Sequence, residues 1–292
     1  MAVCVVSHDA GGAEILASYV AQQSLDALLV LEGPALQVFE RRLGKQSVFS
    51  LEEALPICDW CLCGTSWQSD LEWQAIGQAR QLRKRVVAFL DHWVNYPERF
   101  CRQGIQHLPD EIWVGDVDAE RLAKQCFAEM PIRLVANPYF ADLQRELKDL
   151  EQRRSPKSAA GARVLFVCEN ISEHALRQYG DERYWGYTEF DALDFLFSNL
   201  DKLGRPVESV IIRPHPSDLP GKYQTVLDAY IPLACLGGKR SLLEEIVDAD
   251  IVVGCESMAM VVSLLANRPT WSCSPSNSVV PPLPQKDILR IG

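Results

Sequence analysis

The chain changes from an apolar run to a polar loop within one stretch, Glu208-Ser209-Val210-Ile211-Ile212-Arg213-Pro214-His215-Pro216-Ser217-Asp218. Its first half, from Ser209 to Ile212, is rich in β-branched residues and is typical of a buried strand. The two prolines that follow cannot continue a sheet ladder, so the strand should end on a stiff loop. Because side chains alternate along an extended backbone, we expect Arg213, His215 and Ser217 to point to one side of that loop.

A guanidinium, an imidazole and a hydroxyl at the C-terminal end of a parallel strand suit an anion, most obviously a phosphate group. The alternative is a proline-braced surface loop whose His215 caps a neighbouring helix. The stretch favours the phosphate site, since an arginine placed there without an anionic partner would contribute little.

Strands that alternate with helices recur outward from this stretch in both directions. We expect strands at residues 2–7, 27–31, 59–63, 86–90, 111–114, 132–135, 163–168, 210–212, 251–253 and 270–273. Such alternation predicts an α/β protein with parallel sheets covered on both faces. A long aromatic loop is expected over residues 169–188, and a weakly structured, proline-rich tail over residues 275–292.

The composition changes near residue 141, where a charged helix leads into a linker of small and polar residues, Ser155-Pro156-Lys157-Ser158-Ala159-Ala160-Gly161. We therefore predict two Rossmann-like domains, residues 1–140 and 163–292, joined by a linker helix and hinge at residues 141–162. The length of 292 residues fits this division.

The net charge of −10 argues against nucleic acid as a general partner, because that partner requires a basic face. A basic cluster, Arg80-Gln81-Leu82-Arg83-Lys84-Arg85, is expected to close a helix, and it leaves open a peripheral contact with the inner membrane. The first residues resemble a strand and not a signal peptide, so we expect a cytoplasmic protein whose ten cysteines are reduced and buried.

Ligands of open parallel sheets bind beyond the C-terminal ends of the strands, so polar residues there are candidates for a site. The first half offers His8, Asp9, Gly11, Gly12, Glu14, Thr65, Ser66, Asp91, His92 and Asn95, and the second half offers Glu169, Asn170, Arg213, His215, Ser217, Glu256, Ser257 and Met258. Three of the five histidines belong to this set.

In the first half, the Gly11-Gly12 turn permits close backbone approach to a ligand. Asp9 with His8 is a candidate general base, although Asp9 equally suits the cap of the next helix. Asp91 with His92 poses the same choice. The chain has no dinucleotide fingerprint, so we expect no nicotinamide or flavin cofactor.

In the second half, Glu256-Ser257-Met258 follows one expected strand and opens a helix. The hydroxyl and the first helical amides would donate to phosphate, and Glu256 would accept from ribose hydroxyls. The alternative for Ser257 is a plain helix cap. No Asp-X-Asp metal motif stands at a strand end, and we predict metal independence.

The Arg213-Pro214-His215-Pro216 motif and the later run Ala249-Asp250-Ile251-Val252-Val253-Gly254-Cys255-Glu256-Ser257-Met258-Ala259 resemble the donor half of GT-B glycosyltransferases of bacterial surface polysaccharide synthesis. The motif is similar to the His-Pro motif of bacterial sialyltransferases and capsule Kdo or glycerophosphate transferases, and to the UDP-N-acetylglucosamine 2-epimerase-like superfamily. The resemblance covers residues 160–273, and the acidic-acidic-glycine motif of the sialyltransferases is not found.

The resemblance implies a GT-B fold in which the two domains face each other across a cleft. It implies that His215 and Ser257 contact the phosphate of a CMP- or UDP-linked sugar, and that Asp9 or Asp91 deprotonates a glycan or lipid-linked acceptor. Two alternatives stay open: a nucleotide-sugar epimerase or hydrolase on the same fold, and a non-catalytic protein that binds nucleotide sugars or a partner.

Overall fold

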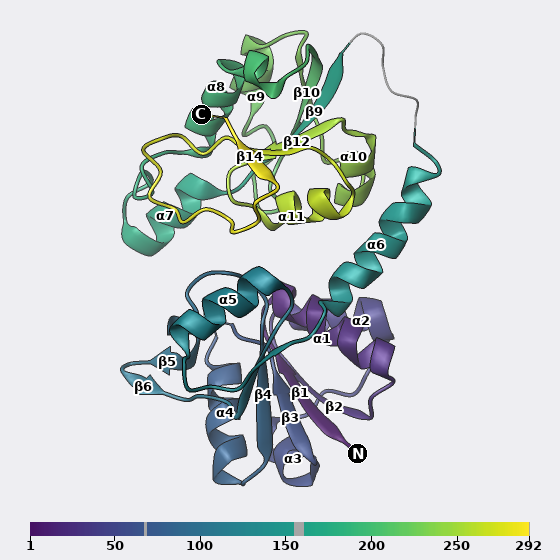
Figure 1. Ribbon diagram of the computed structural model, residues 1–292, viewed down its shortest axis with the longest axis vertical. Helices are drawn as coiled ribbons and strands as arrows, with labels where there is room; N and C mark the ends of the chain where they lie inside the picture. The colour runs from purple at the N-terminus through teal and green to yellow at the C-terminus, as the bar shows by residue number, and fades with distance from the viewer. Residues whose placement is uncertain (67–68, 155–160, 292) are drawn as a thin grey trace. The chain divides into compact units, whose positions relative to one another are not determined.

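The computed structural model describes residues 1–66, 69–154 and 161–291 (Figure 1). The chain folds as two compact units, Met1–Asp142 and Leu143–Gly292. The linker expected at Ser155-Pro156-Lys157-Ser158-Ala159-Ala160 lies outside the described residues.

The first unit is built on a parallel sheet with strand order β2-β1-β3-β4-β7-β8. Its strands are β1 (Val3–Ser7), β2 (Ala27–Leu31), β3 (Trp60–Cys63), β4 (Arg85–Leu90), β7 (Glu111–Val114) and β8 (Ile132–Leu134). Its helices are α1 (Ala10–Gln23), α2 (Ala35–Leu43), α3 (Leu51–Ile57), α4 (Leu71–Gln81), the short 3-10 turn η1 (Glu98–Phe100) and α5 (Val117–Cys126), and a small hairpin pairs β5 (Cys101–Arg102) with β6 (Ile105–Gln106). The helix α6 (Pro138–Glu151) spans the boundary between the units.

The central strands of this sheet are buried on both faces, which explains their uninterrupted apolar sequences. All five residues of β1 are buried, and so are the residues of β4 after Arg85. The core between the sheet and its helices includes Leu16, Phe39 and Phe89, each almost fully buried.

The second unit repeats the plan with strand order β11-β10-β9-β12-β13-β14, again parallel throughout. Its strands are β9 (Ala162–Val167), β10 (Val207–Arg213), β11 (Ala234–Leu236), β12 (Ile251–Gly254), β13 (Thr270–Ser272) and β14 (Ile288–Arg290). Its helices are α7 (Ile171–Tyr179), α8 (Glu189–Phe197), η2 (Leu200–Leu203), α9 (Gln224–Ala229), α10 (Leu242–Asp248) and α11 (Met258–Leu265).

The fold class predicted from the sequence, two Rossmann-like units with parallel sheets, is confirmed. Two local expectations are wrong. The aromatic segment after β9 contains the helix α7, whose buried Ile171 and Ala175 anchor it to the core. The C-terminal tail contains β14, which completes the sheet by pairing with β13.

The cysteines are all free, but the expectation that they are buried is wrong for Cys126 and Cys235, whose side chains are exposed. As expected, Arg80 of the basic cluster lies in the last turn of α4. Within the described residues, the structure has no helix with both the length and the apolar character needed to span a bilayer.

Candidate functional site

The C-terminal edge of the second sheet gathers the residues that the sequence singles out in this half of the chain. In the strand order, β10 and β12 lie on either side of β9, and all three run parallel. The loop that begins at Pro214 and the loop that begins at Cys255 therefore emerge at one edge, with Glu169 and Asn170 between them.

Glu169 and Asn170 connect the two loops. Glu169 Oε1 accepts hydrogen bonds from the backbone N–H groups of Cys255 (3.2 Å) and Glu256 (2.8 Å). The next residue turns the other way, and Asn170 Nδ2 donates to Ser217 Oγ at 3.0 Å. Burial raises the pKa of the Glu169 carboxyl to about 7. One dipeptide thus fixes the spacing between the two loops.

The loop after β10 holds His215 and Ser217 together at the surface. Ser217 Oγ lies 2.7 Å from His215 Nδ1, and the backbone N–H of His215 donates to Asp218 Oδ2 at 2.7 Å. Both His215 and Ser217 are exposed, so a ligand can reach them.

Arg213 does not join them, in contrast to the expectation that three side chains share one side of the loop. Its Nη1 pairs with Glu245 Oε2 at 2.6 Å and donates to the carbonyl of Arg240. The physical reason is the burial of Glu245, whose side chain is 4% exposed and needs a cation. Arg213, at the end of β10, therefore ties the start of the loop to Glu245 of α10.

The loop after β12 leads into α11, of which Met258 is the first residue. Ser257 Oγ accepts from the backbone N–H of Ala259 at 3.2 Å and caps the helix, which is the alternative that the sequence left open. Glu256 ties this loop to the C-terminal segment, because it accepts from Ser274 Oγ at 3.0 Å and from the backbone N–H of Leu283 at 2.6 Å. Burial raises the pKa of Glu256.

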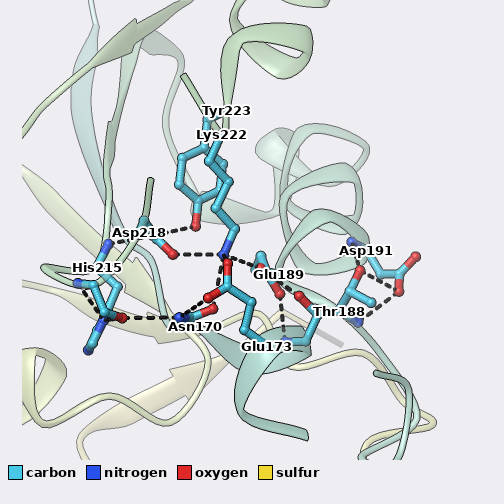
Figure 2. A network of polar contacts seen from close by, with 11 residues as sticks. Asn170, Glu173, Thr188, Glu189, Asp191, His215, Asp218, Lys222 and Tyr223 are labelled. Atoms are coloured by element: carbon cyan, nitrogen blue, oxygen red, sulfur yellow. Dashed lines mark hydrogen bonds and ion pairs between the residues drawn. The ribbon is translucent and has the colours of Figure 1, made fainter. Parts of the chain in front are cut away.

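A lysine whose side chain is 10% exposed supports this edge (Figure 2). Lys222 Nζ pairs with Asp218 at 2.7 Å and with Glu189 at 2.5 Å, and it donates to Asn170 Oδ1 at 3.1 Å. The Asp218 and Glu189 side chains are 0% and 1% exposed, so the lysine is the cation that allows both carboxylates to be buried. The sequence analysis missed Lys222, whose one signal was its spacing of four residues from Asp218.

At the C-terminal end of β1 in the first unit, His8 and Asp9 form a pair. His8 Nδ1 lies 2.7 Å from Asp9 Oδ1, and both side chains are about a quarter exposed. Asp9 occupies the N-cap position of α1, yet its side chain makes no capping hydrogen bond to any residue that the structure describes. The Asp9 carboxylate is therefore engaged with the His8 ring and not with the helix cap.

In the second candidate pair, Asp91 and His92, the carboxylate of Asp91 forms an ion pair within the unit. Asp91 Oδ1 accepts from Arg99 Nη1 at 2.6 Å, and Arg99 is 6% exposed. Burial lowers the pKa of His92. Both residues line a pocket of about 10 Å³, which has room for about one water molecule.

The two glycines after β1 allow close approaches within the unit. A Cβ on Gly11 would lie 2.7 Å from Asp91 Oδ2, and a Cβ on Gly12 would lie 3.7 Å from the Cα of Gly64. A side chain at position 11 would therefore displace the Asp91 carboxylate from its place. Gly12 is needed less, since its distance is an ordinary contact.

The sequence analysis missed Glu72, in the first turn of α4. Its side chain is 2% exposed, its Oε1 accepts from the backbone N–H of His8 at 2.8 Å, and its Oε2 has no hydrogen-bond partner within residues 1–66, 69–154 and 161–291. Burial raises the pKa of Glu72 to about 7. An acidic residue in a first helical turn is ordinary, so no sequence signal distinguished it.

In the part of the chain that the structure describes, no group of His, Cys, Asp and Glu side chains is arranged to hold a metal ion. The sequence matches no protein-family model. It also matches no curated protein.

The fold is shared with solved structures of low sequence identity. The glycotransferase of kitacinnamycin has a TM-score of 0.57 at 11% identity, over 97% of this chain and 82% of that chain. UDP-GlcNAc 2-epimerase from Neisseria meningitidis, bound to UDP-GlcNAc, has a TM-score of 0.59 at 12% identity, over 93% of this chain and 82% of that chain. The chain has the fold that these transferase and epimerase structures share.

Proposed function

We propose that this protein is a glycosyltransferase that uses a nucleotide sugar, CMP- or UDP-linked, and transfers the sugar to a surface polysaccharide or a lipid-linked acceptor. The observation that carries the proposal is the bridge made by Glu169 and Asn170. It holds the exposed His215 loop and the start of α11 at one edge of one sheet, where ligands of such sheets bind.

In this proposal the second unit binds the donor. His215 donates a hydrogen bond to a phosphate oxygen, and the first amides of α11 with the Ser257 hydroxyl face the same phosphate. These groups stabilise the negative charge that grows on the nucleotide as it leaves. Arg213 and Glu256 hold the two loops in place through the contacts described above.

The first unit supplies the base. The Asp9 carboxylate, 2.7 Å from His8 Nδ1, keeps the ring proton on that nitrogen and leaves Nε2 free to accept a proton. In the reaction, Nε2 takes the proton of the acceptor hydroxyl, the acceptor oxygen bonds to the anomeric carbon, and the bond from that carbon to the phosphate oxygen breaks. Its electron pair leaves with the nucleotide.

A thermal-shift panel of CMP, CDP, UDP and GDP tests the donor side, because a ligand that binds the native state raises the melting temperature. We expect a shift with the cytidine or uridine nucleotide, and we expect His215→Ala to remove it. The matched control is Asn199→Ala, which deletes a side chain hydrogen-bonded to Phe195 O at the end of α8. The absence of any shift across the panel would refute the proposal.

A second candidate function is nucleotide-sugar epimerisation, favoured by the shared fold with the N. meningitidis enzyme. Incubation with UDP-GlcNAc and no acceptor separates the two, because an epimerase alters the sugar without a second substrate. We expect the nucleotide sugar to remain unchanged under this condition. Accumulation of an epimer would favour the second candidate.

A further inference from the structure

We propose that a hydrogen-bond relay from Lys222 through Asn170 and Ser217 fixes the tautomer of His215, with the ring proton on Nε2. Figure 2 labels three members of this relay, Lys222, Asn170 and His215, and Ser217 lies between Asn170 and His215 in the chain of hydrogen bonds. The consequence for phosphate binding rests on the proposed function, whereas the tautomer follows from the hydrogen bonds alone. In this account Asn170 is a positioning residue for His215.

The first step is the orientation of the Asn170 amide. Its Oδ1 lies 3.1 Å from Lys222 Nζ, and its Nδ2 lies 2.9 Å from Glu173 Oε2. An ammonium only donates and an ionised carboxylate only accepts, so the reverse orientation would oppose both partners. The amide nitrogen is therefore the end that faces Ser217.

The second step is the direction of the Ser217 hydroxyl. Asn170 Nδ2 donates to Ser217 Oγ at 3.0 Å, which occupies the oxygen as an acceptor. The hydroxyl hydrogen is then free to point at His215 Nδ1, 2.7 Å away. The hydroxyl donates, and Nδ1 accepts.

The third step is independent of any hydroxyl rotation. The backbone N–H of Ser217 also donates to His215 Nδ1, at 3.2 Å. A backbone N–H cannot accept a hydrogen bond, so Nδ1 must carry a lone pair. In the neutral ring the proton then lies on Nε2, and His215 offers a donor without the need for a positive charge.

Lys222 makes the relay rigid. It is 10% exposed and is held between the buried carboxylates of Asp218 and Glu189. Asp218 in turn accepts from the backbone N–H of His215 and from the Tyr223 hydroxyl at 2.9 Å. The Lys222–Asp218 ion pair thus holds both ends of the relay: Lys222 binds the Asn170 amide, and Asp218 binds the backbone of the His215 loop.

His8 shows the opposite arrangement. Its Nδ1 faces a carboxylate, which accepts, so its proton lies on Nδ1. The hydrogen bonds within the first unit thus leave His8 Nε2 as an acceptor, and those within the second unit leave His215 Nε2 as a donor.

The test is a long-range ¹H–¹⁵N correlation spectrum of the full chain labelled at histidine, recorded where the rings are neutral. The His215 signals are assigned as those lost in His215→Ala. We expect the wild-type ring to be protonated on Nε2. A ring protonated on Nδ1, or an equal mixture of both forms, would overturn the proposal.

Asn170→Asp tests the relay itself. A carboxylate at this position accepts from Ser217 Oγ, which turns the hydroxyl away from Nδ1 and allows Nδ1–H to donate in its place. We expect the ring proton to shift toward Nδ1, while the matched Asn199→Asp leaves the spectrum unchanged. If Asn170→Asp keeps the proton on Nε2 as fully as the wild type does, the relay is refuted.

Ser217→Ala provides a second variant at an exposed position, should the first disturb folding. It removes the hydroxyl but keeps the backbone donor, so we expect a partial loss of the Nε2–H form, and no change would refute the relay. These spectra need no nucleotide. An Nε2–H ring in a protein that binds no nucleotide would leave the relay standing and would refute the proposed function.

Discussion

Replacement of Glu72 by glutamine should stabilise the protein at neutral and alkaline pH. Glu72 is 2% exposed, and burial raises its pKa from an ordinary 4.5 to about 7. Because each pH unit between the two pKa values corresponds to about 1.4 kcal/mol, the ionised carboxylate costs the folded state about 3 kcal/mol. Glutamine keeps an oxygen for the backbone N–H of His8 and carries no charge.

The sign of the effect follows from the direction of the pKa change. The folded protein retains a proton on Glu72 in the range between pH 4.5 and about 7, where the unfolded chain has lost it. The stability that this proton contributes is complete below the unfolded pKa and is lost as the pH rises through the folded pKa. The wild type should therefore lose stability relative to Glu72→Gln as the pH increases.

Urea unfolding monitored by tryptophan fluorescence measures the difference, since five of the seven tryptophans belong to the first unit. From about pH 5 to about pH 8 we expect the gap in unfolding free energy to widen by about 2–3 kcal/mol in favour of the variant. The matched control is Glu40→Gln on the exposed side of α2, which should show no such gap. Parallel pH profiles for the wild type and Glu72→Gln would refute the reasoning.

Three further predictions concern the contacts that hold the site. Asp91→Ala leaves the Arg99 guanidinium buried without its carboxylate and should cost about 3–5 kcal/mol in urea unfolding; a cost near zero would contradict the ion pair. Lys222→Met leaves two buried carboxylates unpaired and should cost a similar amount, about 3–5 kcal/mol, in the same assay; equal stability would show that the lysine is not needed. Gly33→Ala places a Cβ 2.7 Å from His8 Nε2 at a φ of +53°, so we expect a loss of about 1–2 kcal/mol in stability and a larger fall in kcat than a change in KM; unchanged kcat would argue against His8 as the base.

The sequence was sufficient for the fold class because the pattern of buried strands is local. The apolar runs near residues 3–7, 85–90 and 251–254 form strands within a residue or two of the expected bounds. The two sheet strands that were missed, β11 and β14, are three residues long, with two of the three residues exposed, and the two-residue strands of the β5–β6 hairpin were missed as well. The pattern of β11 and β14 gives no periodicity to detect, and only pairing with β10 and β13 defines them.

The candidate site was harder to predict because it depends on partners distant in sequence. The expectation that polar residues after parallel strands lie at one edge of the sheet is correct for the positions of His215 and Ser257. The alternation rule failed for Arg213, because a buried glutamate from α10 draws the guanidinium away. Asn170 was a candidate because it follows a strand, but its contact with Ser217 could not be predicted, and Lys222 had no signal beyond its spacing from Asp218.

A crystal structure of the protein with the nucleotide that gives the largest thermal shift tests the central claim most directly. The account predicts a phosphate oxygen within hydrogen-bond distance of His215 Nε2, with the same phosphate facing the first amides of α11. A nucleotide bound elsewhere, with its phosphate away from both His215 and Ser257, would contradict it.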